Sequence, residues 1–217
     1  KKRTKIVFVL IILILFCFTI GYALEDTKDF KSGYLMGDED EYLVILTGRR
    51  WQEFGRDIVI YSLVNGKKEV FRRDISHLKP WKIDIGDVDG DGNLEIAIGV
   101  YKESPLHPIM AKRPFIYNFN GNDLIPKWRG SRLSRPFSDF LLFDVDQDGV
   151  CEIVAIEDLA DGGHIINSYK WKGFGFEGFL ESIENIPFDY LDTSENELYA
   201  VTKNNDLVLR IRVFDLD

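Results

Sequence analysis

Two acidic loops carry the residues of this sequence that are best suited to chemistry. One loop, residues 87–95, reads DVDGDGNLE, and 57 residues later the loop 144–152 reads DVDQDGVCE. Both follow the pattern D-x-D-x-D-G-x-x-E, which offers three alternating carboxylates, a backbone carbonyl and a final Glu. Calcium in proteins takes about six to eight oxygen ligands of these kinds. The two loops therefore predict two calcium sites.

The surroundings of these loops distinguish them from an EF-hand. An EF-hand loop is longer and lies between two helices, whereas strand-like apolar runs flank both loops here. Gly92 and Gly149 allow the positive φ with which each loop turns back on itself. Four carboxylates in one short loop repel one another unless a cation binds or some of them take up protons. Two solvated Asp-rich turns are the alternative interpretation.

The elements that must position these loops are short apolar runs broken by Asn-Gly, Asp-Gly and Pro. Such runs are typical of β-strands, and no long helical pattern follows residue 40. The sequence therefore predicts an all-β chain. The predicted strands are 43–47, 57–64, 68–73, 81–87, 94–102, 114–119, 123–129, 137–144, 152–157, 164–171, 174–180, 188–191, 197–202 and 207–214.

These strands fall into repeats of about 50 residues. Weaker copies of the acidic loop lie at 33–41 and 188–197, and hairpin turns recur at 64–66, 119–121 and 171–173. A repeat of four antiparallel strands cannot bury its own faces and must stack on its neighbours. The predicted fold of residues 26–217 is a β-propeller of about four such blades.

The two loops and the repeat resemble the FG-GAP or VCBS repeats of integrin α-like propellers, in which calcium loops join successive strands. The resemblance covers roughly residues 28–217, although the Gly-Ala-Pro element of that family is missing. It implies extracellular binding and adhesion modules, or parts of polysaccharide-degrading enzymes. The flanking copies replace ligand positions with Leu35 and Leu191 and are expected to bind nothing. The implied calcium ligands are Asp87, Asp89, Asp91, Asn93 through its carbonyl and Glu95, then Asp144, Asp146, Asp148, Val150 through its carbonyl and Glu152.

The last repeat stops after two strands, which leaves two expectations for closure. Residues 28–35 occupy the place of a fourth strand, so they are expected to pair with residues 198–202 and close a small propeller. The alternative is a fragment of a longer propeller, since no Met begins the chain.

Residues 1–25 predict export. Lys1, Lys2, Arg3 and Lys5 precede an uncharged stretch from residue 6 to residue 24, long enough as a hydrophobic helix to cross a hydrocarbon core of about 30 Å. Basic residues before such a segment hold the amino end in the cytoplasm. The prediction is a membrane-anchored protein with an exported domain, or a secreted one if a signal peptide is cleaved after Ala23. The formal net charge of −9 argues against binding to nucleic acid.

A basic segment within residues 102–136 contrasts with this acidic chain. Its candidate ligand-binding residues are Trp128, Arg129, Arg132 and Arg135, because Arg suits anionic groups and Trp can stack on a sugar ring. The alternative is that these Arg side chains pair with acidic loops or face solvent.

Catalysis has little support in the sequence. His77, His107 and His164 lie in three different repeats, and no Ser or Cys stands at a motif spacing from them. We expect a cell-surface binding, adhesion or scaffold module whose partner is a protein or a glycan. The alternative is a calcium-assisted polysaccharide-degrading enzyme that resembles a lyase.

Overall fold

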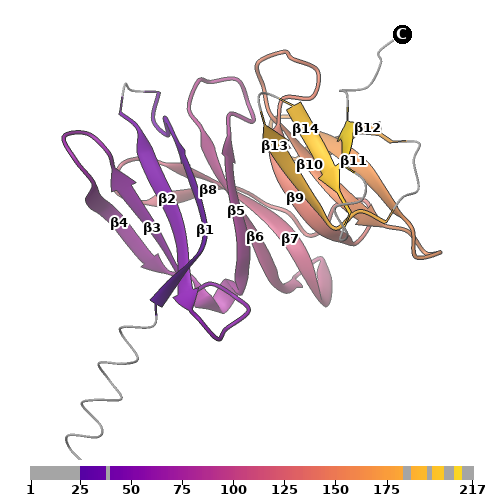
Figure 1. Cartoon of the computed structure of the whole chain (residues 1–217), viewed down its shortest axis with the longest axis horizontal. Coiled ribbons are helices and arrows are strands. Elements are labelled where there is room, and N and C mark those ends of the chain that lie inside the picture. Colours follow the sequence, from indigo (N-terminus) through magenta and orange to yellow (C-terminus); the bar gives the residue numbers. More distant parts are fainter. Residues whose placement is uncertain (1–24, 38–39, 183–186, 195–196, 203–207, 212–217) are drawn as a thin grey trace, which may run out of the picture.

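A computed structural model describes residues 25–37, 40–182, 187–194, 197–202 and 208–211 (Figure 1). Within them the prediction of an all-β chain is confirmed: apart from one short 3-10 helix, η1 (Ser76–Leu78), every regular element is a strand. The strands form three four-stranded sheets and one three-stranded sheet, all antiparallel. In each sheet the strands lie in chain order.

Each sheet is a simple meander. The first contains β1 (Glu25–Gly33), β2 (Tyr42–Arg49), β3 (Asp57–Ser62) and β4 (Lys68–Asp74). The second contains β5 (Pro80–Gly86), β6 (Glu95–Ser104), β7 (His107–Phe119) and β8 (Leu124–Arg129). The third contains β9 (Phe137–Phe143), β10 (Glu152–Asp158), β11 (His164–Trp171) and β12 (Phe176–Glu181), and the fourth contains β13 (Tyr190–Ser194), β14 (Glu197–Val201) and β15 (Val208–Ile211).

The pairing of β1 differs from the expected closure. Residues 28–35 were expected to pair with residues 198–202, but β1 pairs with β2, and β14 pairs with β13 and β15. The sequence repeat suggested that each sheet begins with the strand after an acidic loop. In the structure each sheet begins one strand earlier, with the strand before that loop or, in the first and fourth sheets, with the strand at its weaker copy. A short connection brings β1 beside β2 at a smaller cost in chain entropy than joining distant ends of the chain.

The β6–β7 hairpin is longer than the sequence indicated. β7 begins seven residues before the predicted strand at 114–119, and Ser104 pairs with His107 across a two-residue turn. Pro108 is tolerated in β7 because the part of β7 before Phe115 pairs with β6 alone, so no second ladder needs its missing N–H.

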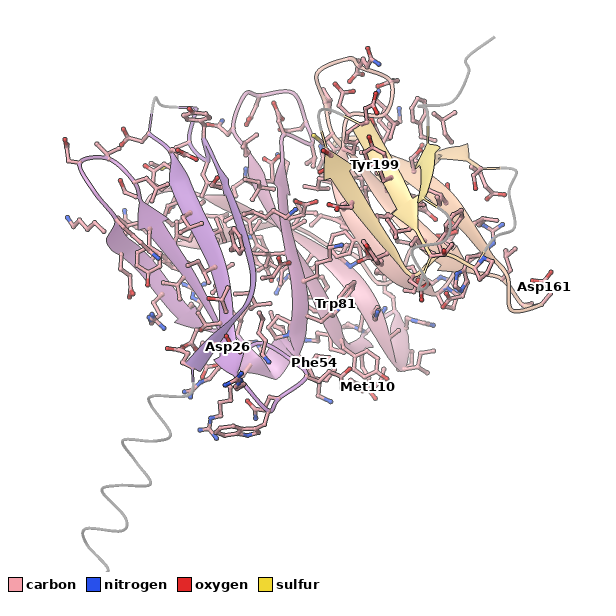
Figure 2. All side chains as sticks on the ribbon, viewed as in Figure 1. Asp26, Phe54, Trp81, Met110, Asp161 and Tyr199 are labelled. Atoms are coloured by element: carbon pink, nitrogen blue, oxygen red, sulfur yellow. The ribbon has the colours of Figure 1, made fainter. Side chains whose placement is uncertain are left out.

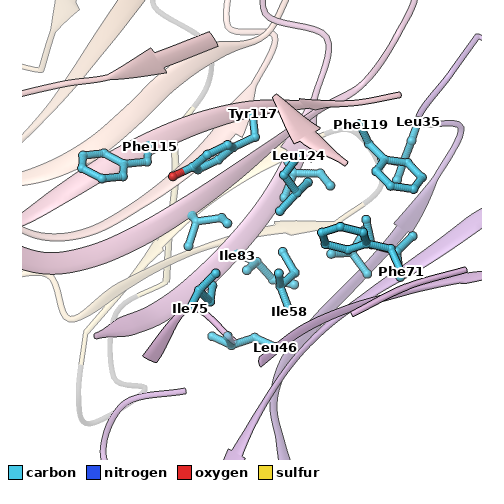
Figure 3. Close-up of a cluster of buried hydrophobic side chains, with 14 of the residues drawn as sticks. Leu35, Leu46, Ile58, Phe71, Ile75, Ile83, Phe115, Tyr117, Phe119 and Leu124 are labelled. Atoms are coloured by element: carbon cyan, nitrogen blue, oxygen red, sulfur yellow. The ribbon is translucent and has the colours of Figure 1, made fainter. Parts of the chain in front are cut away.

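Successive sheets bury their apolar faces against one another in three hydrophobic clusters. The cluster in Figure 3 joins Leu46 and Phe71 of the first sheet to Ile83 and Phe115 of the second. A second cluster joins the second and third sheets, and a third joins the third and fourth. The middle strands read as nearly continuous apolar runs because both of their faces are covered.

Three Asp side chains at a spacing of 55 residues connect the first strands of successive sheets. Asp84 and Asp139 are buried, so a hydrogen bond is needed to offset their loss of solvation. In each case a carboxylate oxygen accepts a hydrogen bond from a backbone N–H of the next first strand: Asp29 from Ile83 at 2.9 Å, Asp84 from Leu142 at 2.8 Å and Asp139 from Leu191 at 2.8 Å.

Lysines add ion pairs along the same line. Lys31 Nζ lies 3.1 Å from Asp84 Oδ1, and Lys82 Nζ lies 2.7 Å from Asp139 Oδ1. In each pair of first strands, the residue numbers of the contacting groups increase together on both strands. The strands β1, β5 and β9 are therefore parallel. The four first strands border one pocket of about 350 Å³, lined by Lys31, Asp84, Ile85, Leu142, Phe143, Thr193 and Ser194.

The parallel first strands give the molecule two distinct ends (Figure 1). The loops 87–94 and 144–151 leave the far ends of β5 and β9, and we call this the acidic-loop end. The start of β1 lies beside Arg49 at the end of β2, and the start of β5 lies beside Val100 near the end of β6. This second end, which we call the Glu25 end, also carries the β6–β7 hairpin turn.

The predicted anchor in residues 1–24 lies outside the described residues, as does the cleavage position after Ala23. In the described part of the chain, no helix is long and apolar enough to cross a membrane.

Candidate metal centres

The first Asp of each acidic loop organises the loop backbone. Asp87 accepts hydrogen bonds from the N–H groups of Gly90 at 2.7 Å and Gly92 at 2.8 Å. Asp144 likewise accepts from Asp148 at 3.1 Å and Gly149 at 2.9 Å. Gly92 has φ 83° and Gly149 has φ 89°, so the prediction of positive φ at these glycines is confirmed.

The final Glu of each loop lies beneath the loop. Glu95 and Glu152 are both 0% exposed. Their Oε2 atoms accept hydrogen bonds from the N–H of Val88 at 2.9 Å and of Val145 at 3.0 Å, respectively. The Oε2 atom of each Glu thus fixes the start of the loop, and the Oε1 atom remains for other partners.

Three of the predicted carboxylates come together in each loop. In the first loop they are Asp87, Asp89 and Glu95, and in the second they are Asp144, Asp146 and Glu152, with one oxygen of each residue within 4.8 Å of the others. This spacing suits a metal ion, since calcium lies about 2.3 to 2.6 Å from each of its oxygen ligands.

The other predicted ligands close the loop turn. Asp91 Oδ1 accepts hydrogen bonds from the backbone N–H and the side-chain amide of Asn93, at 2.8 and 2.9 Å. Asp148 Oδ1 accepts from the N–H of Val150 at 2.9 Å. Asn93 and Val150, predicted to act through their carbonyl oxygens, thus hold the turn through their N–H groups.

A lysine that the sequence analysis did not assign to the site enters each carboxylate group. Lys127 of β8 contacts Asp89 and lies 2.7 Å from Glu95 Oε1. Lys170 of β11 lies 2.7 Å from Asp146 Oδ2, 2.5 Å from Asp148 Oδ2 and 3.3 Å from Glu152 Oε1. The two ammonium groups stand where a bound cation would neutralise the carboxylates.

Hairpin alignment could have identified Lys170. It directly precedes the turn at 171–173, and Asn118 occupies the same place before the turn at 119–121. The side-chain amide of Asn118 donates to Glu95 Oε1 at 2.7 Å. The residue before this hairpin turn therefore reaches the buried Glu in both repeats.

Burial and ion pairing shift the pKa values of the lysines in these groups in opposite directions. Burial raises the pKa of Glu95 and of Glu152. Burial would lower the pKa of Lys127 and Lys170, but hydrogen bonds to the carboxylates outweigh it and raise both values. The hydrogen bond from Lys170 lowers the pKa of Asp148. Each group holds three carboxylates and only one ammonium group, so it retains an excess of acceptors for a divalent ion.

The second loop holds two incompletely satisfied buried oxygens. Asp146 Oδ1 and Glu152 Oε1 have no hydrogen-bond partner among the described residues, and Glu152 Oε1 has only the 3.3 Å ion pair with Lys170. Buried polar atoms of this kind are uncommon and costly. A metal ion would coordinate both atoms, so the residues present fit a calcium ion.

The flanking copies of the loop have apolar residues at the corresponding places. Leu35 and Leu191 are buried in the first and third hydrophobic clusters, so they offer no oxygen there.

Gln147 in the second loop holds a left-handed backbone with φ 59°, where the first loop has Gly90 at φ 76°. A residue with a Cβ loses about 1 kcal/mol or more in this conformation. We expect Gln147→Gly to raise the free energy of unfolding in chelator by about 1 kcal/mol, as measured by urea denaturation. Gln147→Ala is the matched control, because it retains the Cβ. An equal effect of both substitutions would contradict the strain argument.

The basic segment is divided between the core and the surface. Trp128 packs edge to face on Phe176, with ring centroids 5.0 Å apart, beside the second hydrophobic cluster. Arg135 pairs with Glu157 at 3.0 Å and Glu181 at 2.9 Å. Arg129 and Arg132 are exposed. Arg132 and Arg135 border a pocket of about 340 Å³ with His107, Lys112, Leu133 and Phe137 among its other residues.

A scan against models of known protein families gives no match to this chain, and a search of curated proteins gives none either. What the acidic loops do is therefore inferred from their own geometry.

Proposed function

We propose that the chain is an exported, membrane-anchored, calcium-binding β-propeller that serves as a binding, adhesion or scaffold module at the cell surface. The observation that carries this proposal is the grouping of two Asp carboxylates with a buried Glu in each acidic loop. The incompletely satisfied oxygens of Asp146 and Glu152 support a metal ion at the second loop. Titration of the full chain with calcium tests the proposal, with two ions per chain expected.

The donor atoms favour calcium over softer metals. Carboxylate and carbonyl oxygens suit hard cations, whereas zinc prefers Cys and His. Cys151 is the one cysteine among the described residues, and burial raises the pKa of its thiol to about 12, so it stays protonated at neutral pH. Lys127 and Lys170 have long side chains that can withdraw from the carboxylates as the ion enters.

The order of the sheets supports the propeller. Four antiparallel meanders follow one another, and their first strands border one pocket. Side-chain bonds from Asp29, Asp84 and Asp139 join each first strand to the next. In the FG-GAP or VCBS repeats that the sequence resembles, calcium loops join successive strands, as the two acidic loops do here.

The location of the histidines favours a binding module over an enzyme. His77, His107 and His164 all lie at the opposite end of the strands from the acidic loops. A calcium-assisted lyase needs a proton-accepting side chain close to the substrate that the metal holds. Release of unsaturated sugar products by the calcium-loaded protein would favour the enzyme alternative. Saturable binding of a cell-surface protein or glycan without turnover would favour the module.

Membrane anchoring leads to a prediction about topology. The four basic residues before residue 6 should keep the amino end inside, so the region after residue 25 is exported. We expect protease added to intact cells to digest this region and to leave a membrane-bound amino-terminal fragment. Protection of the region in intact cells would contradict export. Recovery of the protein in the medium, beginning at Leu24, would instead indicate cleavage after Ala23.

A further inference from the structure

Several of the exposed apolar side chains lie at the Glu25 end of the molecule, although others, such as Phe174 and Tyr34, lie elsewhere. Leu106 at the tip of the β6–β7 hairpin is 87% exposed, Ile109 beside it is 56% exposed, and Trp51 in the β2–β3 loop is 61% exposed. Figure 2 shows Asp26, Phe54 and Met110 along the lower edge of the molecule. Single exposed apolar residues are common, but these lie on a loop and a hairpin at the same end of the molecule.

Two contacts join these loops into one face. Lys28 Nζ donates to the carbonyl of Gln52 at 2.6 Å, so the β2–β3 loop lies against β1. The rings of Phe54 and Tyr101 stack with centroids 5.8 Å apart, so the same loop also lies against β6. We call residues 49–54, 75–79 and 102–110 the Glu25-end face.

This face has a small excess of positive charge, with Arg49, Arg50, Lys79 and Lys102 against Glu53 and Glu103, although the chain as a whole is acidic. Arg49, Arg50 and Lys79 are exposed, and none of them has a carboxylate partner among the described residues. Instead, Arg49 lies over the ring of Trp51 at 5.9 Å, and Lys79 lies near the ring of Phe54 at 5.9 Å. The two acidic loops lie at the other end of the strands. The Glu25-end face thus holds an excess of two positive charges, four Lys or Arg against two Glu.

The uncharged segment of residues 6–24 ends one residue before β1 begins. If this segment anchors the protein, as proposed above, no linker separates the bilayer from the strand. The Glu25-end face then lies at the lipid surface.

We propose that the Glu25-end face docks on an anionic lipid bilayer. Trp51 and the apolar hairpin tip suit the boundary between headgroups and acyl chains, where Trp is enriched. Arg49, Arg50 and Lys79 suit the phosphates of anionic headgroups. In this orientation both acidic loops face away from the membrane, where a partner can reach them.

The test uses the full chain with Cys17→Ala, reconstituted in vesicles of phosphatidylcholine mixed with phosphatidylglycerol. Leu106→Cys carries an environment-sensitive fluorophore on the face, and Asn122→Cys carries the same fluorophore in the exposed β7–β8 turn at the opposite end. Quenching by doxyl-labelled lipid is then measured. We expect strong quenching at position 106 and little at position 122. The Cys17→Ala parent corrects for any labelling of Cys151.

Charge dependence separates docking from simple tethering. Arg49→Gln, Arg50→Gln and Lys79→Gln together should lower the ratio of docked to undocked protein about a hundredfold, since each basic residue near an anionic surface contributes about a factor of five. Vesicles of pure phosphatidylcholine should lower this ratio by a similar factor for the unsubstituted face. Equal quenching at positions 106 and 122, or quenching that ignores these charges, would overturn the docking proposal. Release of the chain from the vesicles by an alkaline wash would instead overturn the anchor.

Discussion

Calcium should bind the full chain with a stoichiometry of two and stabilise it strongly against unfolding. A ligand that binds only the folded state adds about 2.7 kcal/mol per site when its concentration is a hundred times the dissociation constant. We expect the gain because three carboxylates are grouped in each loop and only one lysine pairs with them, which leaves repulsion that a calcium ion would relieve. Titration calorimetry and thermal melts with and without chelator measure both effects. A stoichiometry near zero, or a melting temperature indifferent to chelator, would contradict the metal assignment.

Matched variants assign each ion to its loop. Asp89→Ala and Asp146→Ala should each remove one site, because each deletes one of the three grouped carboxylates. Asp192→Ala is the control: Asp192 is an exposed residue of β13, and its loss should leave two sites.

Lys170→Met tests whether the ammonium occupies the place of the ion in the second loop. Without calcium this variant should be less stable than the parent, because Asp146 and Asp148 lose their cation. With calcium the difference should vanish or reverse, because the ion no longer displaces an ammonium group. A variant that weakens calcium binding would indicate that Lys170 supports the ion instead of competing with it.

Asp139→Ala should destabilise the fold by about 3 kcal/mol, because it breaks a buried ion pair and leaves its partners unsatisfied. Asp139 lies 2.7 Å from Lys82 Nζ and accepts a hydrogen bond from the N–H of Leu191 at 2.8 Å. Its loss leaves the ammonium of Lys82 uncompensated at a largely buried position and removes a bond between the third and fourth sheets.

Urea denaturation in the presence of chelator measures this effect apart from metal binding. Glu177→Ala on β12 is the control, since this exposed Glu should change stability by less than about 0.5 kcal/mol. If Asp139→Ala and Glu177→Ala lower the free energy of unfolding by the same amount, the Asp hydrogen bonds between first strands do not hold the sheets together.

The strands and the acidic loops were predictable from the sequence because the signals that define them are local. Alternating or continuous apolar runs between turn residues indicate strands whatever lies beside them. Asp87 and Asp144 fold their own loops through N–H groups within five residues, and Gly92 and Gly149 supply the positive φ. The spacing of carboxylates within nine residues was therefore enough to locate both candidate sites.

The tertiary structure decided which groups from different strands and sheets meet. Lys127 and Lys170 lie 32 and 18 residues after Glu95 and Glu152 and reach the carboxylates from other strands of the same sheets, and Trp128 of the basic segment packs on Phe176 of the next sheet. The 55-residue spacing of the Asp residues was present in the sequence. The role of an Asp in an apolar run, however, depends on a backbone N–H from the first strand of the next sheet, which the sequence pattern does not reveal. The partner of β1 also depended on the pairing of whole strands. Each of these outcomes is set by long-range packing, in which buried charges and N–H groups must find partners from distant segments.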